Sequence, residues 1–100
     1  MQQPGKPDFV TEVIDLFLGD AAIQLDKLRD ALSANDDLER KRLAHLIKGS
    51  SANVGANRMA KLLEELENTD TDATRANTTF TILESEFTQV KADLVSERRA

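Results

Sequence analysis

The chain has 100 residues, 40% of them hydrophobic, and a formal net charge of −5 at pH 7. This length fits one domain with a single modest core, so we treat residues 1–100 as one domain. Tryptophan, tyrosine and cysteine are absent, which excludes disulfides, thiolate metal sites and cysteine nucleophiles. The start, MQQPGKPDF, lacks a signal-peptide apolar region, and no apolar run is long enough to span a membrane. We therefore expect a cytoplasmic protein.

The charges are unevenly distributed along the chain. The segment from Glu39 to Lys61 contains a single acid, Glu39, and the cations Arg40, Lys41, Arg42, Lys48, Arg58 and Lys61. The acidic total argues against nonspecific binding of nucleic acid. The basic segment suits an acidic protein partner or a phosphoryl group, and the alternative is an ordinary solvated helix face.

The first predicted element is a long helix. Apolar residues recur at intervals of three and four between Val10 and Leu32, the spacing of one helix face. This pattern predicts a helix over about residues 8–34, with Pro7 and Asp8 at its start. The pair Gly19-Asp20 could kink this helix or divide it in two.

The second predicted helix contains His45, the only histidine of the chain. Its start is marked by Asp36 and Glu39, which resemble a capping box. Gly55 is the predicted end, because glycine commonly terminates helices in the left-handed conformation.

Two further stripes follow, over residues 59–66 and 76–94. The sequence NTDTD, residues 68–72, is the predicted turn between them, and the third helix is expected to reach Glu67. The weak helix formers NTTFT make the beginning of the last helix less well defined. Four amphipathic stripes joined by short polar loops predict an all-α, up-and-down four-helix bundle.

On the second helix, His45 is predicted to face away from the core. At roughly 100° per residue from Leu43, the predicted buried face comprises Ile47, Ser50, Val54 and, slightly wider, Leu46. His45 lies roughly 200° from Leu43, so it points outward, although most lone histidines are structural or incidental. By the same construction, its neighbours within about 60° are Lys41, Lys48, Gly49 and Ala52.

The residue types at Gly49 and Lys48 indicate what could approach or bind at this outward face. Glycine inside a helix costs about 1 kcal/mol relative to alanine, and core packing does not require a small residue at this exposed position. Gly49 and Ala52 would leave a bare surface beyond the imidazole of His45, over which a globular partner could approach. Neutral drift or bending of the helix is the alternative explanation for Gly49. Lys48 can place an ammonium beside a group attached to the ring, which suits the anionic charge of phosphoryl transfer.

The segment HLIKGSSANVGA resembles the His-x-x-Lys-Gly-Ser/Ala motif of histidine-containing phosphotransfer domains. The resemblance covers nearly the whole chain, including VIDLFLGDAAIQLDKLRDAL before the motif and MAKLLEELE after it. It implies that His45 carries a phosphoryl group received from the aspartyl phosphate of a receiver domain and passed to another receiver aspartate. It also implies that Lys48 stabilises the phosphoryl charge and that Gly49 gives clearance to the receiver.

One position departs from the pattern of this family, in which a glutamine of the neighbouring helix frequently binds the histidine. The matching residue here is Glu67. A carboxylate in contact with the ring would accept a proton from one nitrogen, fix the tautomer and raise the basicity of the other nitrogen. The alternative is an ordinary surface glutamate.

The resemblance implies a phosphoryl carrier without kinase activity of its own. The expected partners are response regulator receiver domains and a hybrid or sensor histidine kinase, and Lys41, Arg42, Gly49 and Ala52 are the expected contact residues. No cofactor is expected, with Mg²⁺ supplied by the receiver, and we expect a monomer that binds neither membrane nor nucleic acid. We expect a stand-alone protein from the initial Met and the complete set of four stripes, and the alternative is a domain cut from a larger hybrid kinase. The alternatives are direct phosphorylation by a histidine kinase core, as in chemotaxis kinases, and a helical adaptor in which His45 is incidental.

Overall fold

The computed structural model of the protein describes residues 9–68 and 72–99. These residues form four helices: α1 (Phe9–Ser33), α2 (Asp37–Asn53), α3 (Asn57–Glu67) and α4 (Ala73–Arg99). The predicted helix start at Pro7 and Asp8, and residues 69–71 of the predicted turn, lie outside the described residues. The all-α prediction is confirmed.

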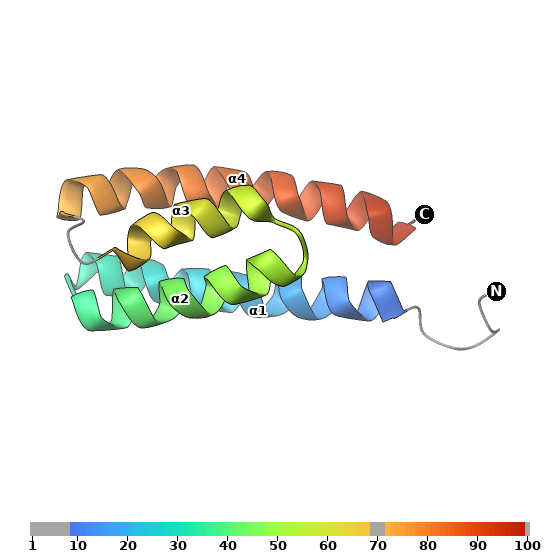
Figure 1. The fold of residues 1–100 in the computed structure, drawn as a ribbon, viewed down its shortest axis with the longest axis horizontal. Helices are drawn as coiled ribbons and strands as arrows, with labels where there is room; N and C mark the ends of the chain where they lie inside the picture. The colour runs from blue at the N-terminus through green and yellow to red at the C-terminus, as the bar shows by residue number, and fades with distance from the viewer. Residues whose placement is uncertain (1–8, 69–71, 100) are drawn as a thin grey trace.

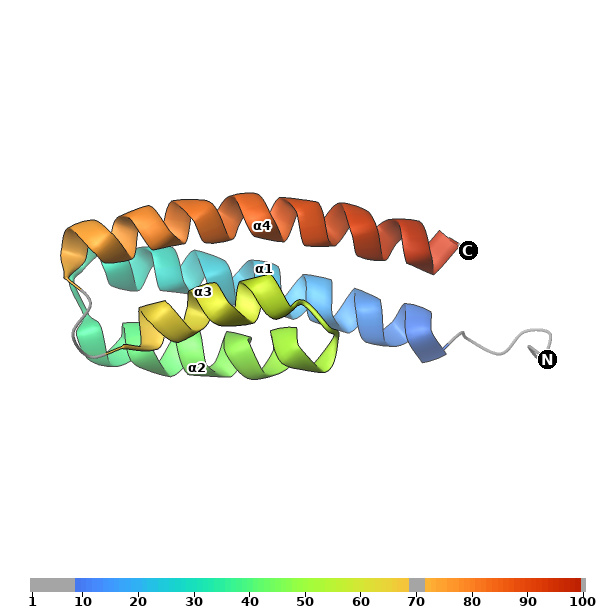
Figure 2. The ribbon, with the colours of Figure 1, turned by 45° about the horizontal axis from the view of Figure 1, so that its top comes forward.

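The helices form an up-and-down bundle in which each helix packs against the next and α4 packs against α1 (Figure 1). The two outer helices in the chain, α1 and α4, have 25 and 27 residues, whereas α2 and α3 have 17 and 11. Both long helices therefore continue beyond the α2–α3 connection, at the end of the bundle where α1 begins and α4 ends (Figure 2). The site residues predicted on α2 therefore lie in the part of the bundle where all four helices are present.

The first helix is not divided at Gly19-Asp20, and α1 is a single helix from Phe9 to Ser33. Its buried stripe includes Phe17 and Ala21, on either side of the glycine. Packing of this stripe on the core offsets the modest helix penalty of one glycine. Division of the helix, one of the options left open by the sequence, is thus not observed.

Local sequence signals set both ends of α2. Asn35 has a φ of 53°, and the bond from Asp36 N to Ala31 O closes α1 in a Schellman motif. Asp36 then caps α2, because its Oδ1 accepts a hydrogen bond of 3.1 Å from Glu39 N. At the other end, Gly55 has a φ of 80°, and the bond from Ala56 N to Ser51 O completes a second Schellman motif. The predicted start and end of this helix are confirmed.

The core is built mainly from aliphatic side chains of all four helices. Its buried members include Leu25 and Leu28 of α1, Leu43 and Ile47 of α2, Met59, Leu63 and Leu66 of α3, and Phe80 and Leu83 of α4. No helix among the described residues is long and apolar enough to cross a membrane.

The buried face of α2 differs from the predicted one. Leu43 and Ile47 are buried as expected, but Leu46 is 45% exposed and Ser50 and Val54 are only half-buried. The other buried positions of α2 are Arg40, Ala44 and Ser51. The helix is thus rotated by about 50° from the predicted orientation, calculated at 100° per residue. Periodicity fixes the angles between residues of one helix, whereas packing against α1 and α3 decides how that helix is turned.

Candidate functional site

His45 lies on the surface of α2 and is bound by a carboxylate from α3. Its side chain is 71% exposed, and its Nδ1 lies 2.8 Å from Oε2 of Glu67. A carboxylate only accepts hydrogen bonds, so this contact places the proton of a neutral imidazole on Nδ1 and leaves Nε2 unprotonated. The ring is therefore oriented by a neighbour 22 residues away in the sequence.

The same carboxylate also binds Lys48. Lys48 Nζ lies 2.6 Å from Glu67 Oε1, so the two oxygens of Glu67 contact two different side chains of α2. The hydrogen bond from Lys48, followed by that from His45, holds the pKa of Glu67 below its ordinary value. The hydrogen bond to Glu67 in turn raises the pKa of Lys48. Glu67 is therefore ionised at neutral pH and Lys48 is charged.

The rotation of α2 explains why these three groups meet. Turning the helix by about 50° places Gly49 nearly opposite the core and moves His45 toward α3. Glu67 is the last residue of α3, and its side chain is only 28% exposed. The sequence left open whether Glu67 reaches the ring or is an ordinary surface glutamate, and the structure brings it to the ring.

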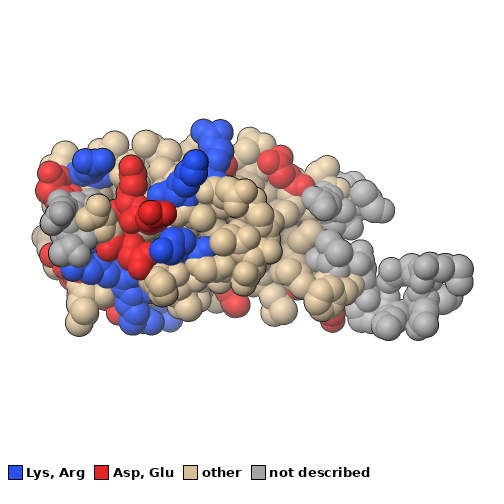
Figure 3. Space-filling view, viewed as in Figure 1, with Lys and Arg blue, Asp and Glu red and all other residues tan. Residues whose placement is uncertain are grey.

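The surface beyond His45 is open and uncharged. Gly49 and Ala52 are both exposed, and a Cβ atom built on Gly49 would meet nothing within 4 Å. The seven residues from Gly49 to Gly55 carry no charge. In Figure 3, charged side chains gather over one half of this face, and a largely uncharged surface adjoins them. No contact among residues 9–68 and 72–99 requires the residue at position 49 to lack a side chain.

Most cations of the basic segment are engaged with partners. Arg42 is exposed and donates two hydrogen bonds, of 2.8 and 2.7 Å, to the carboxylate of Glu39. Arg58 lies 3.8 Å from Glu86 of α4. Lys41 is half-buried on α2, one turn before His45. Exposed pairs of this kind contribute little to stability, so Arg42 remains able to exchange Glu39 for a partner.

The burial of Arg40 was not predicted from the sequence. It belongs to the basic segment from Glu39 to Lys61, but it is 3% exposed and donates hydrogen bonds to backbone carbonyls of Leu66 and Asn68 at the end of α3. Its spacing was the available signal, because it precedes Leu43 by three residues and Ile47 by seven. A cation at this spacing belongs to the buried stripe of the helix.

Within residues 9–68 and 72–99, no group of three or more His, Asp or Glu side chains is arranged to hold a metal ion. The histidine site brings together an imidazole, a carboxylate and an ammonium. Together with the bundle, it defines a class of helical protein that presents one oriented surface histidine beside an open face.

Comparison with known proteins identifies the family within this class. A family model described as the Hpt domain matches residues 12–93. The crystal structure of histidine-containing phosphotransfer protein B from Pseudomonas aeruginosa PAO1 is similar, with a TM-score of 0.81 and 28% identity over 98% of this chain and 97% of that one. The chain belongs to the Hpt domain family.

Two curated relatives come from Arabidopsis thaliana. Histidine-containing phosphotransfer protein 5 is 37% identical over 62 residues, and histidine-containing phosphotransfer protein 2 is 35% identical over 65 residues. These alignments cover 59% and 62% of this chain, but only 40% and 42% of the relatives. The chain thus spans less than half the length of the curated relatives that it matches.

Proposed function

We propose that the protein is a phosphorelay intermediate. His45 accepts a phosphoryl group from the aspartyl phosphate of one receiver domain and passes it to an aspartate of another. The observation that carries this proposal is the 2.8 Å contact between His45 Nδ1 and Glu67 Oε2 on a ring that is 71% exposed. Membership in the Hpt domain family supports it.

The transfer follows from the tautomer that Glu67 favours. Nε2 keeps its lone pair and attacks the phosphorus atom of the aspartyl phosphate. The N–P bond forms as the P–O bond to the aspartate breaks, and the aspartate leaves as a carboxylate. The proton stays on Nδ1, so the positive charge that develops on the ring lies beside the carboxylate of Glu67. Onward transfer is the reverse reaction with a second aspartate as the nucleophile.

Lys48 supplies the cation for the transferred group. Its ammonium rests 2.6 Å from Glu67 Oε1, on the same carboxylate that holds the ring. Phosphoryl oxygens are strong acceptors for an ammonium, so we expect Lys48 to turn toward the phosphoryl group when it arrives. Glu67 thus keeps Lys48 next to the ring in the unphosphorylated protein.

The proposed partners are receiver domains of response regulators and a hybrid or sensor histidine kinase. Gly49 and Ala52 leave room for a receiver beside the ring, and Lys41 and Arg42 lie on α2 one turn before His45. The protein acts as a cytoplasmic, monomeric carrier without kinase activity of its own. Mg²⁺ enters with the receiver, and the carrier needs no cofactor.

The test is labelling by a purified, radiolabelled phospho-receiver. Acid-labile, base-stable label indicates a phosphoramidate, and its loss on substitution of His45, the only histidine in the chain, assigns the label to this residue. His45→Gln should accept no label, and its free energy of unfolding should change by about 0.5 kcal/mol or less, as expected for a surface position. Wild-type labelling of this variant would refute the proposal.

A parallel incubation distinguishes the alternatives. Labelling of the wild type by a histidine kinase core with ATP, in the absence of any receiver, would identify a domain that the kinase phosphorylates directly. Binding of a partner that survives His45→Ala, with no acid-labile label on the wild type, would identify a helical adaptor. Either result would contradict the proposed role as a phosphorelay intermediate.

A further inference from the structure

Arg40 lies in the interior of the bundle, five residues before His45 on the same helix. Its side chain is 3% exposed. Burying a guanidinium is costly unless its N–H groups find acceptors. The acceptors of Arg40 therefore indicate what this side chain does.

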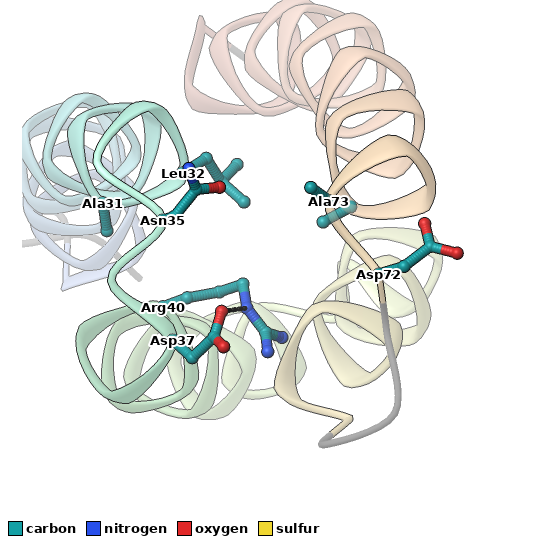
Figure 4. Close-up of a pocket in the computed structure, with 8 residues that line it drawn as sticks. Ala31, Leu32, Asn35, Asp37, Arg40, Asp72 and Ala73 are labelled. Atoms are coloured by element: carbon teal, nitrogen blue, oxygen red, sulfur yellow. Dashed lines mark ion pairs between the residues drawn. The ribbon is translucent and has the colours of Figure 1, made fainter.

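The guanidinium binds the two peptide carbonyls on either side of Glu67. Its Nη1 donates to Leu66 O and to Asn68 O, the second at 3.2 Å, and its Nε lies 3.6 Å from Asp37 Oδ1. Figure 4 shows Arg40 extending from α2 along one wall of a cavity, paired with Asp37. The last carbonyls of a helix have no partner within it, so Arg40 caps the C-terminus of α3.

This cap fixes the backbone that carries Glu67. The last turn of a helix frays readily, and Glu67 is the final residue of α3. His45 and Lys48 lie five and eight residues beyond Arg40, about 7.5 and 12 Å along the axis at 1.5 Å per residue. Helix α2 thus holds the end of α3 at two places. Arg40 binds the backbone on either side of Glu67, and His45 and Lys48 bind the carboxylate of Glu67.

We propose that Arg40 is a positioning residue for phosphoryl transfer. It holds the end of α3 in register with α2, so that the carboxylate of Glu67 stays within hydrogen-bonding distance of His45 Nδ1. The effect on transfer rests on the proposed function, whereas the effect on the tautomer of the ring does not. Nη1 makes both carbonyl contacts while Nε faces Asp37, so the single ammonium of lysine can keep only part of this set.

The test compares Arg40→Met and Arg40→Lys with the wild type by two measurements. The ¹⁵N chemical shifts of the His45 ring report which nitrogen carries the proton, and a phospho-receiver reports the rate of transfer. We expect a wild-type ring protonated on Nδ1 and, in Arg40→Met, a shift toward mixed tautomers. The transfer rate should fall about tenfold, because misplacement by about 1 Å can cost up to about 100-fold, and Arg40→Lys should lie between the two.

Two controls separate positioning from general destabilisation. Leu83→Ala removes a fully buried side chain of α4 and should lower the melting temperature while leaving the ring shifts unchanged. Arg29→Met removes an arginine that pairs with Asp26 and Glu84 and links α1 to α4. Both controls should transfer at rates within about twofold of the wild type when compared well below their melting temperatures.

A double variant tests whether Arg40 acts through Glu67. In a Glu67→Ala background, Arg40→Met should change the transfer rate by less than about twofold, because the group that it positions is absent. An equal rate loss with and without Glu67, or wild-type ring shifts in a folded Arg40→Met, would overturn the proposal. If Arg40→Met does not fold, the same criteria apply to Arg40→Lys. A wild type that accepts no phosphoryl group would refute the proposed function, and the ring shifts would still decide the role of Arg40.

Discussion

At the scale of single residues, the site depends on one carboxylate that serves two side chains. Glu67 contacts His45 through Oε2 and Lys48 through Oε1, at 2.8 and 2.6 Å. The contact with the imidazole selects its tautomer, and the contact with the ammonium keeps a cation beside the ring. These two functions of Glu67 can be separated by substitution.

Removing the cation should slow transfer without unfolding the protein. Lys48→Ala leaves the contact between Glu67 and His45 in place but removes the charge that would face the phosphoryl oxygens. The transfer rate should fall by about 10-fold to 100-fold, the scale of one hydrogen bond to a charged group. Rapid-quench labelling by a phospho-receiver measures this change, with Lys61→Ala on the exposed surface of α3 as the control. Equal rates for the two variants would show that Lys48 is merely a solvated lysine.

The interaction of Glu67 with Lys48 and His45 should make stability depend on pH in acid. The pKa of Glu67 lies below its ordinary value of 4.5, chiefly because Lys48 donates a hydrogen bond to it. A lowered pKa means that the contribution is fully present above the unfolded value and is lost as the pH falls through the folded value. Thermal unfolding of the wild type and Glu67→Gln should therefore differ at about pH 7, and the difference should be smaller at about pH 3. A difference of equal size at both pH values would contradict this linkage.

At the scale of elements, α2 has well-defined ends and an exposed glycine in its middle. Its ends are fixed by Asp36 and by the Schellman motif at Gly55, whereas Gly49 in its middle contributes neither packing nor a special φ value. A glycine at an exposed helical position weakens the helix. The proposed docking of a receiver domain would account for a glycine beside His45, and this explanation can be tested by substitution.

Filling this position should increase stability and block docking. Gly49→Gln should stabilise the protein by several tenths of a kcal/mol, because the glycine penalty disappears and the new Cβ meets open space. Transfer from a receiver should nevertheless collapse, since a long side chain one turn beyond His45 obstructs the aspartyl phosphate. Labelling by a small-molecule phosphodonor should persist.

The matched control is Gly19→Gln on α1, where a Cβ also meets nothing within 4 Å. It should gain similar stability and keep normal transfer. A Gly49→Gln protein that is less stable and yet accepts phosphate normally from its receiver would show that the glycine serves the helix.

At the scale of the whole molecule, the core and the site are physically separate. Leu28 of α1 is fully buried, whereas His45 lies on the outer surface of α2. Leu28→Ala should lower the free energy of unfolding by about 2 to 5 kcal/mol through lost burial and the cavity left behind. Its transfer rate should match the wild type at temperatures well below its melting point. Calorimetry and labelling of the same sample check both parts, and a lost transfer rate in the folded variant would show that the core governs the site.

Sequence patterns within one segment predicted what depends on that segment alone. The apolar stripes located the four helices, Asp36 and Gly55 marked the ends of α2, and the spacing of His45, Lys48 and Gly49 placed them on one surface. These features depend on backbone periodicity and on hydrogen bonds between residues a few positions apart. Features of this kind can therefore be predicted without knowing how the helices pack.

The tertiary structure decided the rotation of α2, the burial of Arg40 and the contact of Glu67 with the ring. Each of these depends on how one helix is turned and shifted against another. Periodicity specifies the relative angles of residues on a helix, but the energy of packing sets its absolute orientation. The sequence by itself therefore determined the histidine, its lysine and the cleared surface, and only the packing of α3 on α2 placed the carboxylate that orients the histidine.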